Sequence, residues 1–68
     1  MKLSARNILK GTVVDVELGA TTAHIKIDIG GAVITSSITV EAAKDLALKK
    51  GDAAYAVIKS SDVIVGRD

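Results

Sequence analysis

The segment from Thr22 to Val40 constrains the fold of this chain most strongly, because two runs in it alternate from one residue to the next. From Thr22 to Ile29 every second residue is Ala or Ile and the residues between are polar, which places one row in a core and the other outward. Gly30-Gly31 supplies the positive φ angles that a tight hairpin turn needs. From Ala32 to Val40 the chain alternates again, with small side chains on both faces. The segment predicts a β-hairpin whose second strand is covered on both sides.

The residues on either side of this hairpin predict further elements. Ile8 to Leu18, rich in Val and Ile and followed by a Gly19-Ala20 turn, predicts a first strand. Glu41 to Leu48 has the apolar spacing of one short helix, with Thr39 where an N-cap hydroxyl would stand. Ala53 to Lys59 predicts a fourth strand and Val63 to Val65 a fifth, separated by a turn at Ser60-Ser61-Asp62.

The order β-β-β-α-β-β is that of an all-β fold with one short helix, a five-stranded Greek-key barrel of the oligonucleotide/oligosaccharide-binding (OB) type. Residues 1–68 contain no proline, repeat or linker and are expected to form a single domain. A monomer of this size buries a small core, and the chain has no cysteine and one histidine, so disulfides and metal clusters cannot reinforce it. We therefore expect identical chains to associate.

The charge balance and the lack of aromatic residues argue against several classes of partner. Nine basic and eight acidic residues give a net charge of +1, which is too small to indicate a binding surface for nucleic acid or a membrane. An OB-type nucleic-acid-binding module is the alternative function, but it would need aromatic platforms, and Tyr55 is the only aromatic residue. The N-terminus lacks a signal-peptide core, and no run approaches membrane-spanning length. We expect a cytoplasmic protein.

Two donor-rich segments near the chain ends are the best lead to function. Ser4-Ala5-Arg6-Asn7 precedes the first strand and Lys59-Ser60-Ser61 follows the fourth, and apart from the Asn7 amide both offer only positive charge and hydroxyl or backbone donors. This chemistry suits a fully deprotonated oxyanion. Plainer interpretations stay open, namely a solvated arginine in a frayed terminus, a lysine at a strand end and serines in a turn.

The remaining polar residues carry weaker signals. Thr39 lies at the expected helix start, where unpaired N–H groups and the positive end of the macrodipole favour an anion, although nearly every helix start is merely capped. His24 has no serine, cysteine or carboxylate spaced to form a nucleophile pair, so an exposed or interface position is favoured over catalysis. The acidic residues lack calcium-loop spacing. The sequence therefore predicts neither an enzyme nor a metal site.

The donor-rich segments resemble those of the molbindins, small bacterial molybdate-binding proteins also called Mop domains. The resemblance covers essentially the whole chain and rests on the opening MKLSARNILKG, the SIT before the helix and the late VIKSSDV. It implies an OB-type barrel that forms a hexamer, a trimer of dimers, and binds molybdate or tungstate between subunits, with no catalytic cofactor. The family's motif residues carry over to Ser4, Ala5, Arg6, Asn7, Thr39, Lys59 and Ser60.

Ala42 departs from the family's pattern, because relatives often have a serine at this point in the first helical turn. A hydroxyl ligand is lost there, which leaves the Ala42 N–H as the group that can point at the anion. The resemblance also implies a second kind of oxyanion site where further subunits meet. We place that site near Gly19, Ala20, Thr21 and Thr22, with His24 beside it.

The donor set also indicates which anion fits. Molybdate and tungstate are tetrahedral dianions without protons at neutral pH, so their ideal cavity holds donors only, whereas hydrogen phosphate needs an acceptor for its proton. Arg6 and Lys59 match the charge of one dianion. We expect storage, buffering or delivery of molybdate for molybdenum cofactor assembly. A purely structural or ligand-sensing module is a further alternative, since related domains occur fused to transport ATPases and to helix-turn-helix regulators.

Overall fold

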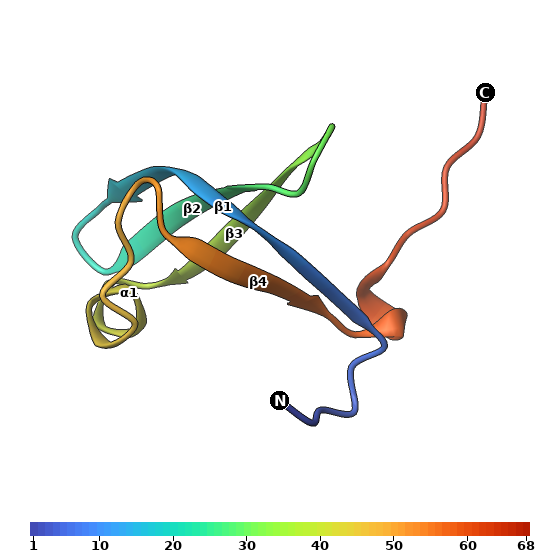
Figure 1. Cartoon of the computed structure of the whole chain (residues 1–68), viewed down its shortest axis with the longest axis horizontal. Coiled ribbons are helices and arrows are strands. Elements are labelled where there is room, and N and C mark those ends of the chain that lie inside the picture. The colour runs from blue at the N-terminus through green and yellow to red at the C-terminus, as the bar shows by residue number, and fades with distance from the viewer.

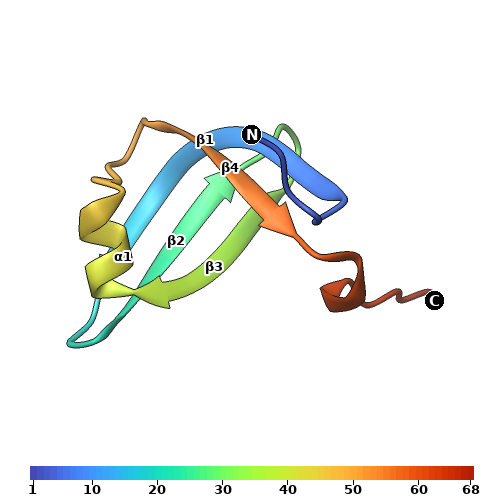
Figure 2. The same ribbon diagram turned by 90° about the horizontal axis from the view of Figure 1, so that it is seen from below.

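The computed structural model describes residues 1–68 and shows four strands, one α-helix and one 3-10 turn. The strands form one antiparallel sheet in the order β3-β2-β1-β4, which curves into a half-barrel (Figure 1, Figure 2). The predicted all-β fold with one short helix is confirmed. In chain order the elements are β1 (Asn7–Leu18), β2 (Thr22–Asp28), β3 (Val33–Thr39), α1 (Val40–Asp45), β4 (Ala53–Ile58) and η1 (Ser60–Asp62).

The longest strand, β1, pairs with a different neighbour along each half. From Asn7 to Thr12 it pairs with β4, and from Thr12 to Leu18 it pairs with β2. The register with β2 shifts between Val13 and Asp15, an irregularity that bends the strand close to the point where it changes partner. The sheet therefore folds over the middle of β1, which gives the half-barrel its curvature (Figure 2).

Gly11 lies on β1 just before this fold, where the end of β2 comes close. A Cβ atom at Gly11 would overlap the backbone carbonyl oxygen of Asp28 and lie 2.7 Å from Cγ2 of Ile27. A residue without a side chain permits this approach of the two backbones. The curvature of the sheet thus depends on a glycine at this position.

The β2–β3 hairpin follows the alternation of its sequence. Ala23, Ile25 and Ile27 are buried and the polar residues between them are exposed, as predicted. The turn is also confirmed, since Gly30 and Gly31 have φ angles of 89° and 101°. In β3 one row is half-buried and the other is exposed. The prediction that both faces of this strand are covered is therefore wrong for the single chain.

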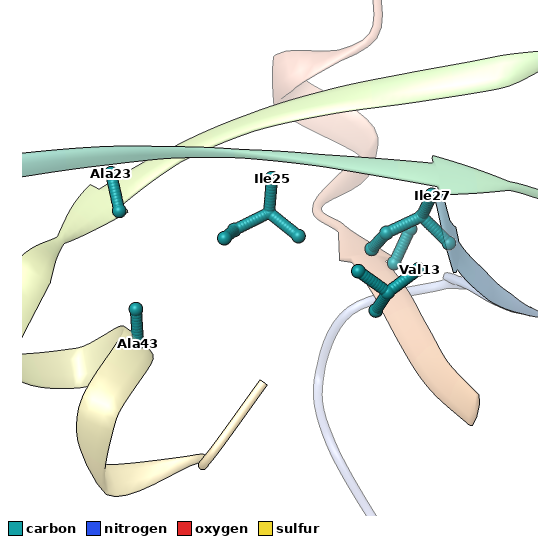
Figure 3. Close-up of a cluster of buried hydrophobic side chains, with 6 residues drawn as sticks. Val13, Ala23, Ile25, Ile27 and Ala43 are labelled. Atoms are coloured by element: carbon teal, nitrogen blue, oxygen red, sulfur yellow. The ribbon is translucent and has the colours of Figure 1, made fainter. Parts of the chain in front are cut away.

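The core lies inside the curved sheet, between residues of β1, β2 and β4, with α1 closing one end, and it is small. In Figure 3, Ala43 of α1 faces Ala23 of β2, so short side chains let the helix approach the sheet closely. Little apolar burial means little stability for an isolated chain. The buried residues number 6 of 68, namely Val13, Ala23, Ile25, Ile27, Ala43 and Ala56.

The helix α1 is shorter than its sequence predicts, because the apolar spacing continues to Leu48 but the helix ends at Asp45. Ala47 adopts a φ of 50°. The N–H groups of Ala47 and Leu48 donate to the carbonyl oxygens of Lys44 and Ala43 at 3.0 and 3.2 Å. This is the Schellman arrangement, in which the last carbonyls find backbone donors and the helix cannot continue.

The predicted fifth strand is wrong for the single chain. Val63, Ile64 and Val65 belong to no strand of the sheet and are 50%, 93% and 90% exposed. Their β-branched side chains favour an extended backbone, but η1 carries the segment away from the sheet (Figure 1). The five-stranded barrel is therefore incomplete, and it is open between β3 and β4.

Replacing Gly11 with alanine is expected to lower the stability of the protein, because the new methyl group must displace the backbone of β2. Overpacking of this kind costs about 1–3 kcal/mol. Thermal and urea unfolding at one protein concentration measure the loss. Gly66→Ala is the matched control, since a Cβ at Gly66 meets nothing within 4 Å, and equal effects of the two substitutions would contradict the packing argument.

Candidate functional site

The two donor-rich segments at the chain ends lie side by side (Figure 1). Asn7 begins β1 and pairs with Ile58 at the end of β4, so Ser4-Ala5-Arg6 enters the sheet where Lys59-Ser60 leaves it. The Asn7 side chain fastens this junction, because its Nδ2 donates to the Ile58 carbonyl oxygen at 3.1 Å. Asn7 therefore holds the two segments together. We call Ser4 to Asn7 with Lys59 and Ser60 the first donor cluster.

Thr39 and Ala42 lie elsewhere, at the start of α1. The predicted N-cap is confirmed, since Oγ1 of Thr39 accepts a hydrogen bond from the Ala42 N–H at 3.0 Å, and that N–H is thus already paired. The Val40 N–H donates to the Thr21 carbonyl oxygen at 2.9 Å, which ties the helix start to the β1–β2 turn. A hollow at this point is lined by Ala20, Thr21, Thr39, Val40, Glu41 and Lys44. We call Thr21, Thr39, Ala42 and Lys44 the second donor cluster.

The two clusters lie at opposite ends of β1, as both views of the ribbon show (Figure 1, Figure 2). The first cluster adjoins the first residue of β1, and the turn that bears Thr21 follows its last. A strand of 12 residues has a contour length on the order of 35 Å at about 3.3 Å per residue, and although β1 bends, both views show its two ends on opposite sides of the molecule. The hydrogen bonds to an oxyanion are about 2.7–3.2 Å long. One anion therefore cannot contact both clusters of one chain.

The residues predicted for a second oxyanion site lie at the same end as Thr39. Thr22 pairs with Thr39 between β2 and β3. His24 lies further along β2 on its exposed face, opposite Glu17 of β1. Thr39 and Ala42 of the first predicted site thus lie at the same end of the molecule as all the residues predicted for the second site.

Sequence analysis missed Glu41 and Lys44, which line the hollow beside Thr39. Their spacing of three residues places them on one face of a helix, and that spacing was the available signal. Lys44 adds a cation to the two threonine hydroxyls. Glu41 adds a carboxylate, so the donor-only description suits the first cluster and fails for the surroundings of the second.

The charged candidates are open to solvent in the single chain. Arg6, Lys59 and Lys44 are all exposed. Attraction between charges is weak in water and grows as water is excluded, so an anion is held better in an enclosed site. Neither cluster encloses a ligand alone. No group of three or more His, Cys, Asp or Glu side chains is arranged to hold a metal ion.

Comparison with known proteins assigns the chain to a family. Residues 3–65 match the family model of the TOBE domain. A probable molybdenum-pterin-binding protein of Haemophilus influenzae is 51% identical over 67 residues, and the match covers 97% of each chain. The chain is a Mop-type member of the TOBE-domain family.

Two solved structures share the Mop-type fold. A molybdate-binding protein from Sporomusa ovata has a TM-score of 0.93 at 34% identity, over 98% of this chain and 100% of that one. The cytoplasmic molybdate-binding protein ModG, solved with molybdate bound, has a TM-score of 0.89 at 51% identity, over 94% of this chain and 46% of that one. These relatives are named for binding, and this Mop-type chain is a binding protein and not an enzyme. None of its helices has the length and apolar character needed to cross a membrane.

Replacing Thr39 of this Mop-type chain with valine is expected to cost about 1 kcal/mol of stability, because the Ala42 N–H loses its acceptor. Thr39→Asp should keep most of the stability, since aspartate is a good N-cap residue. Thermal unfolding of both variants at one protein concentration measures the difference. Equal melting temperatures for the valine and aspartate variants would contradict the capping role.

Proposed function

We propose that this Mop-type chain binds molybdate between copies of itself, where the first donor cluster of one copy meets the second donor cluster of another. The observation that carries the proposal is the separation of the two clusters along β1, because each offers a cation and hydroxyl groups and neither encloses a dianion. Molybdate is the favoured anion because ModG, 51% identical in the matched part, was solved with molybdate bound.

Each residue of the proposed site has a role that its position suggests. Arg6 and Lys59 supply positive charge against the two negative charges of the anion. Asn7 holds these two cations at one place through its bond to Ile58. Hydroxyl and backbone N–H groups donate the remaining hydrogen bonds, from Ser4, Ala5, Thr39 and Ser60. Ala42 lies beside them, and its N–H serves the Thr39 cap in the single chain.

The proposal extends to tungstate, which has the same charge and shape as molybdate and also carries no proton. Phosphate is expected to bind most weakly, because the first cluster offers little to accept its proton. Sulfate is a dianion of the same shape, so only the size of the cavity separates it from molybdate. Glu41 works against this selectivity, and Lys44, one helical turn away, offsets its charge.

The proposal includes an assembly of identical chains, which the molbindin resemblance describes as a hexamer, a trimer of dimers. The edge strands β3 and β4 carry no charged residue and no proline, which are the usual means of blocking a sheet edge. The hollow between them is almost entirely apolar in its lining. The unpaired segment from Val63 to Val65 suits such a hollow in another copy, where it would add the fifth strand.

The cellular role that we propose is storage, buffering or delivery of molybdate for molybdenum cofactor assembly, with residues 1–68 acting as one domain. We place it in the cytoplasm, as ModG is described. A second oxyanion site near the β1–β2 turn, with Gly19 to Thr22 and His24, belongs to the same proposal. Its support is that these residues are grouped beside Thr39, which also belongs to the second donor cluster.

Arg6→Ala and Lys59→Ala are each expected to weaken molybdate binding by about 2–5 kcal/mol, the usual cost of truncating a charged partner in an enclosed interface. Titration calorimetry with molybdate, tungstate, sulfate and phosphate measures both affinity and selectivity. Lys50→Ala is the matched control, because Lys50 is exposed in the loop before β4 and belongs to neither cluster. Equal losses at all three positions would indicate a diffuse charge effect and no defined site.

Mixing two inactive variants tests whether the site is shared between copies. Arg6→Ala damages the first cluster, and Thr39→Asp keeps the helix cap but places a carboxylate in the second. When the two chains are unfolded together and refolded in equal amounts, random association leaves about a quarter of the sites with two intact halves. Molybdate binding should return to that extent. If the mixture binds no more than its separate components, the site is not shared in this way.

A further inference from the structure

Two oppositely charged side chains line the hollow beside Thr39. Glu41 and Lys44 of α1 lie three residues apart, which places both on one face of the helix. Ala43 between them turns to the core, and both charged residues are exposed. The charges also suit the helix, because a carboxylate in its first turn and an ammonium group in its last turn oppose the macrodipole. A role at the anion is therefore shown only by a measurement that helix stability does not affect.

The hollow combines several donors with one charged acceptor. An ammonium group only donates hydrogen bonds and a carboxylate only accepts them, while a hydroxyl group can do both. Oγ1 of Thr39 accepts from the Ala42 N–H at 3.0 Å, and its own proton remains available to donate. Lys44 and the hydroxyl groups of Thr21 and Thr39 can thus donate to an anion in this hollow. Glu41 can form a hydrogen bond only with a proton that the anion itself carries.

Lys44 restores the charge balance of the proposed site, which Glu41 disturbs. Arg6 and Lys59 match the charge of one dianion, and the second donor cluster brings a further cation beside a carboxylate. A carboxylate repels a dianion twice as strongly as it repels a monoanion at the same distance. Glu41 therefore opposes molybdate, and Lys44 supplies the charge that compensates for it. A site that holds all four groups and one dianion is electrically neutral.

We infer that Glu41 and Lys44 form a specificity pair, in which Lys44 is a third cation at the anion and Glu41 is the acceptor that admits a protonated oxyanion. The inference rests on the proposed site shared between copies. Hydrogen phosphate gains a charge-assisted hydrogen bond to Glu41, whereas molybdate and sulfate carry no proton at neutral pH and meet only its charge. Glu41 thus narrows the difference in affinity between molybdate and phosphate.

Glu41→Gln tests the acceptor role, because it keeps the shape of the side chain and removes its charge. The affinities for molybdate and sulfate should each rise about tenfold, the effect of one charged contact in a partly enclosed site. Phosphate affinity should rise by less, because the charged acceptor of its proton is lost while the repulsion is relieved. Calorimetric titration with molybdate, and competition by sulfate and by phosphate, measure the three factors. One common factor for all three anions would overturn the acceptor role.

Asp45→Asn is the matched control for this charge change. Asp45 is exposed, ends the same helix and does not line the hollow. Its substitution should leave the ratio of molybdate affinity to phosphate affinity unchanged. A shift equal to that of Glu41→Gln would indicate a general charge effect and no specificity pair. Thermal unfolding of both variants measures any loss of helix stability, which by itself lowers the affinity for all anions alike.

Lys44→Gln, alone and combined with Glu41→Gln, tests the third cation. The single variant should bind molybdate about tenfold more weakly than the wild type. If Lys44 meets the anion, the two effects cancel and the double variant binds molybdate about as well as the wild type. If Lys44 only screens Glu41, the double variant binds as tightly as Glu41→Gln alone, and the assignment of Lys44 is overturned.

The outcomes separate this inference from the proposed function. Glu41 and Lys44 variants with wild-type affinity for every anion would overturn the specificity pair, while the Arg6→Ala result would still decide the site. A wild-type chain that binds no molybdate would overturn both.

Discussion

The rest of the structure depends on the pairing of β1 with two different strands. One half of β1 holds β4 and the other half holds β2, so a single strand carries the sheet through its bend. The bend requires the backbones at Gly11 and Asp28 to come closer than any side chain would allow. Because each half of β1 pairs with a different strand, its two ends lie beside different parts of the chain. This is why the two donor-rich segments meet at one end and the helix starts at the other.

In the assembly that we propose, the same arrangement links folding to association and to the ligand. A half-barrel with few buried residues, three of them alanines, leaves much apolar surface on the outside. The two edge strands lack the charges and prolines that would keep other strands away. Water can be excluded from the donor clusters by the contact that covers this apolar surface. In this view the second copy stabilises the fold and encloses the anion together.

The features that could be predicted from the sequence are the ones that neighbouring residues decide. The hairpin follows from alternation and two glycines, and the Thr39 cap follows from a hydroxyl placed before a helix. The end of α1 could not be predicted, because Ala47 adopts a left-handed conformation that alanine rarely takes. The fifth strand could not be predicted either. Val63 to Val65 have strand propensity, but a strand needs a free edge within reach, and η1 directs the segment away from both edges.

The sequence by itself determined the chemistry of the first donor cluster, because Ser4 to Asn7 with Lys59 and Ser60 contain two cations and no carboxylate. It also determined the family, through short runs that need no structure to be recognised. Only the tertiary structure decided how those residues are grouped. Asn7 joins Arg6 to Lys59 across the whole length of the chain, whereas Thr39 and Ala42 lie beyond the far end of a 12-residue strand. Pairing across a sheet brings distant residues together and separates others by the length of a strand, and neither effect can be read from their order in the chain.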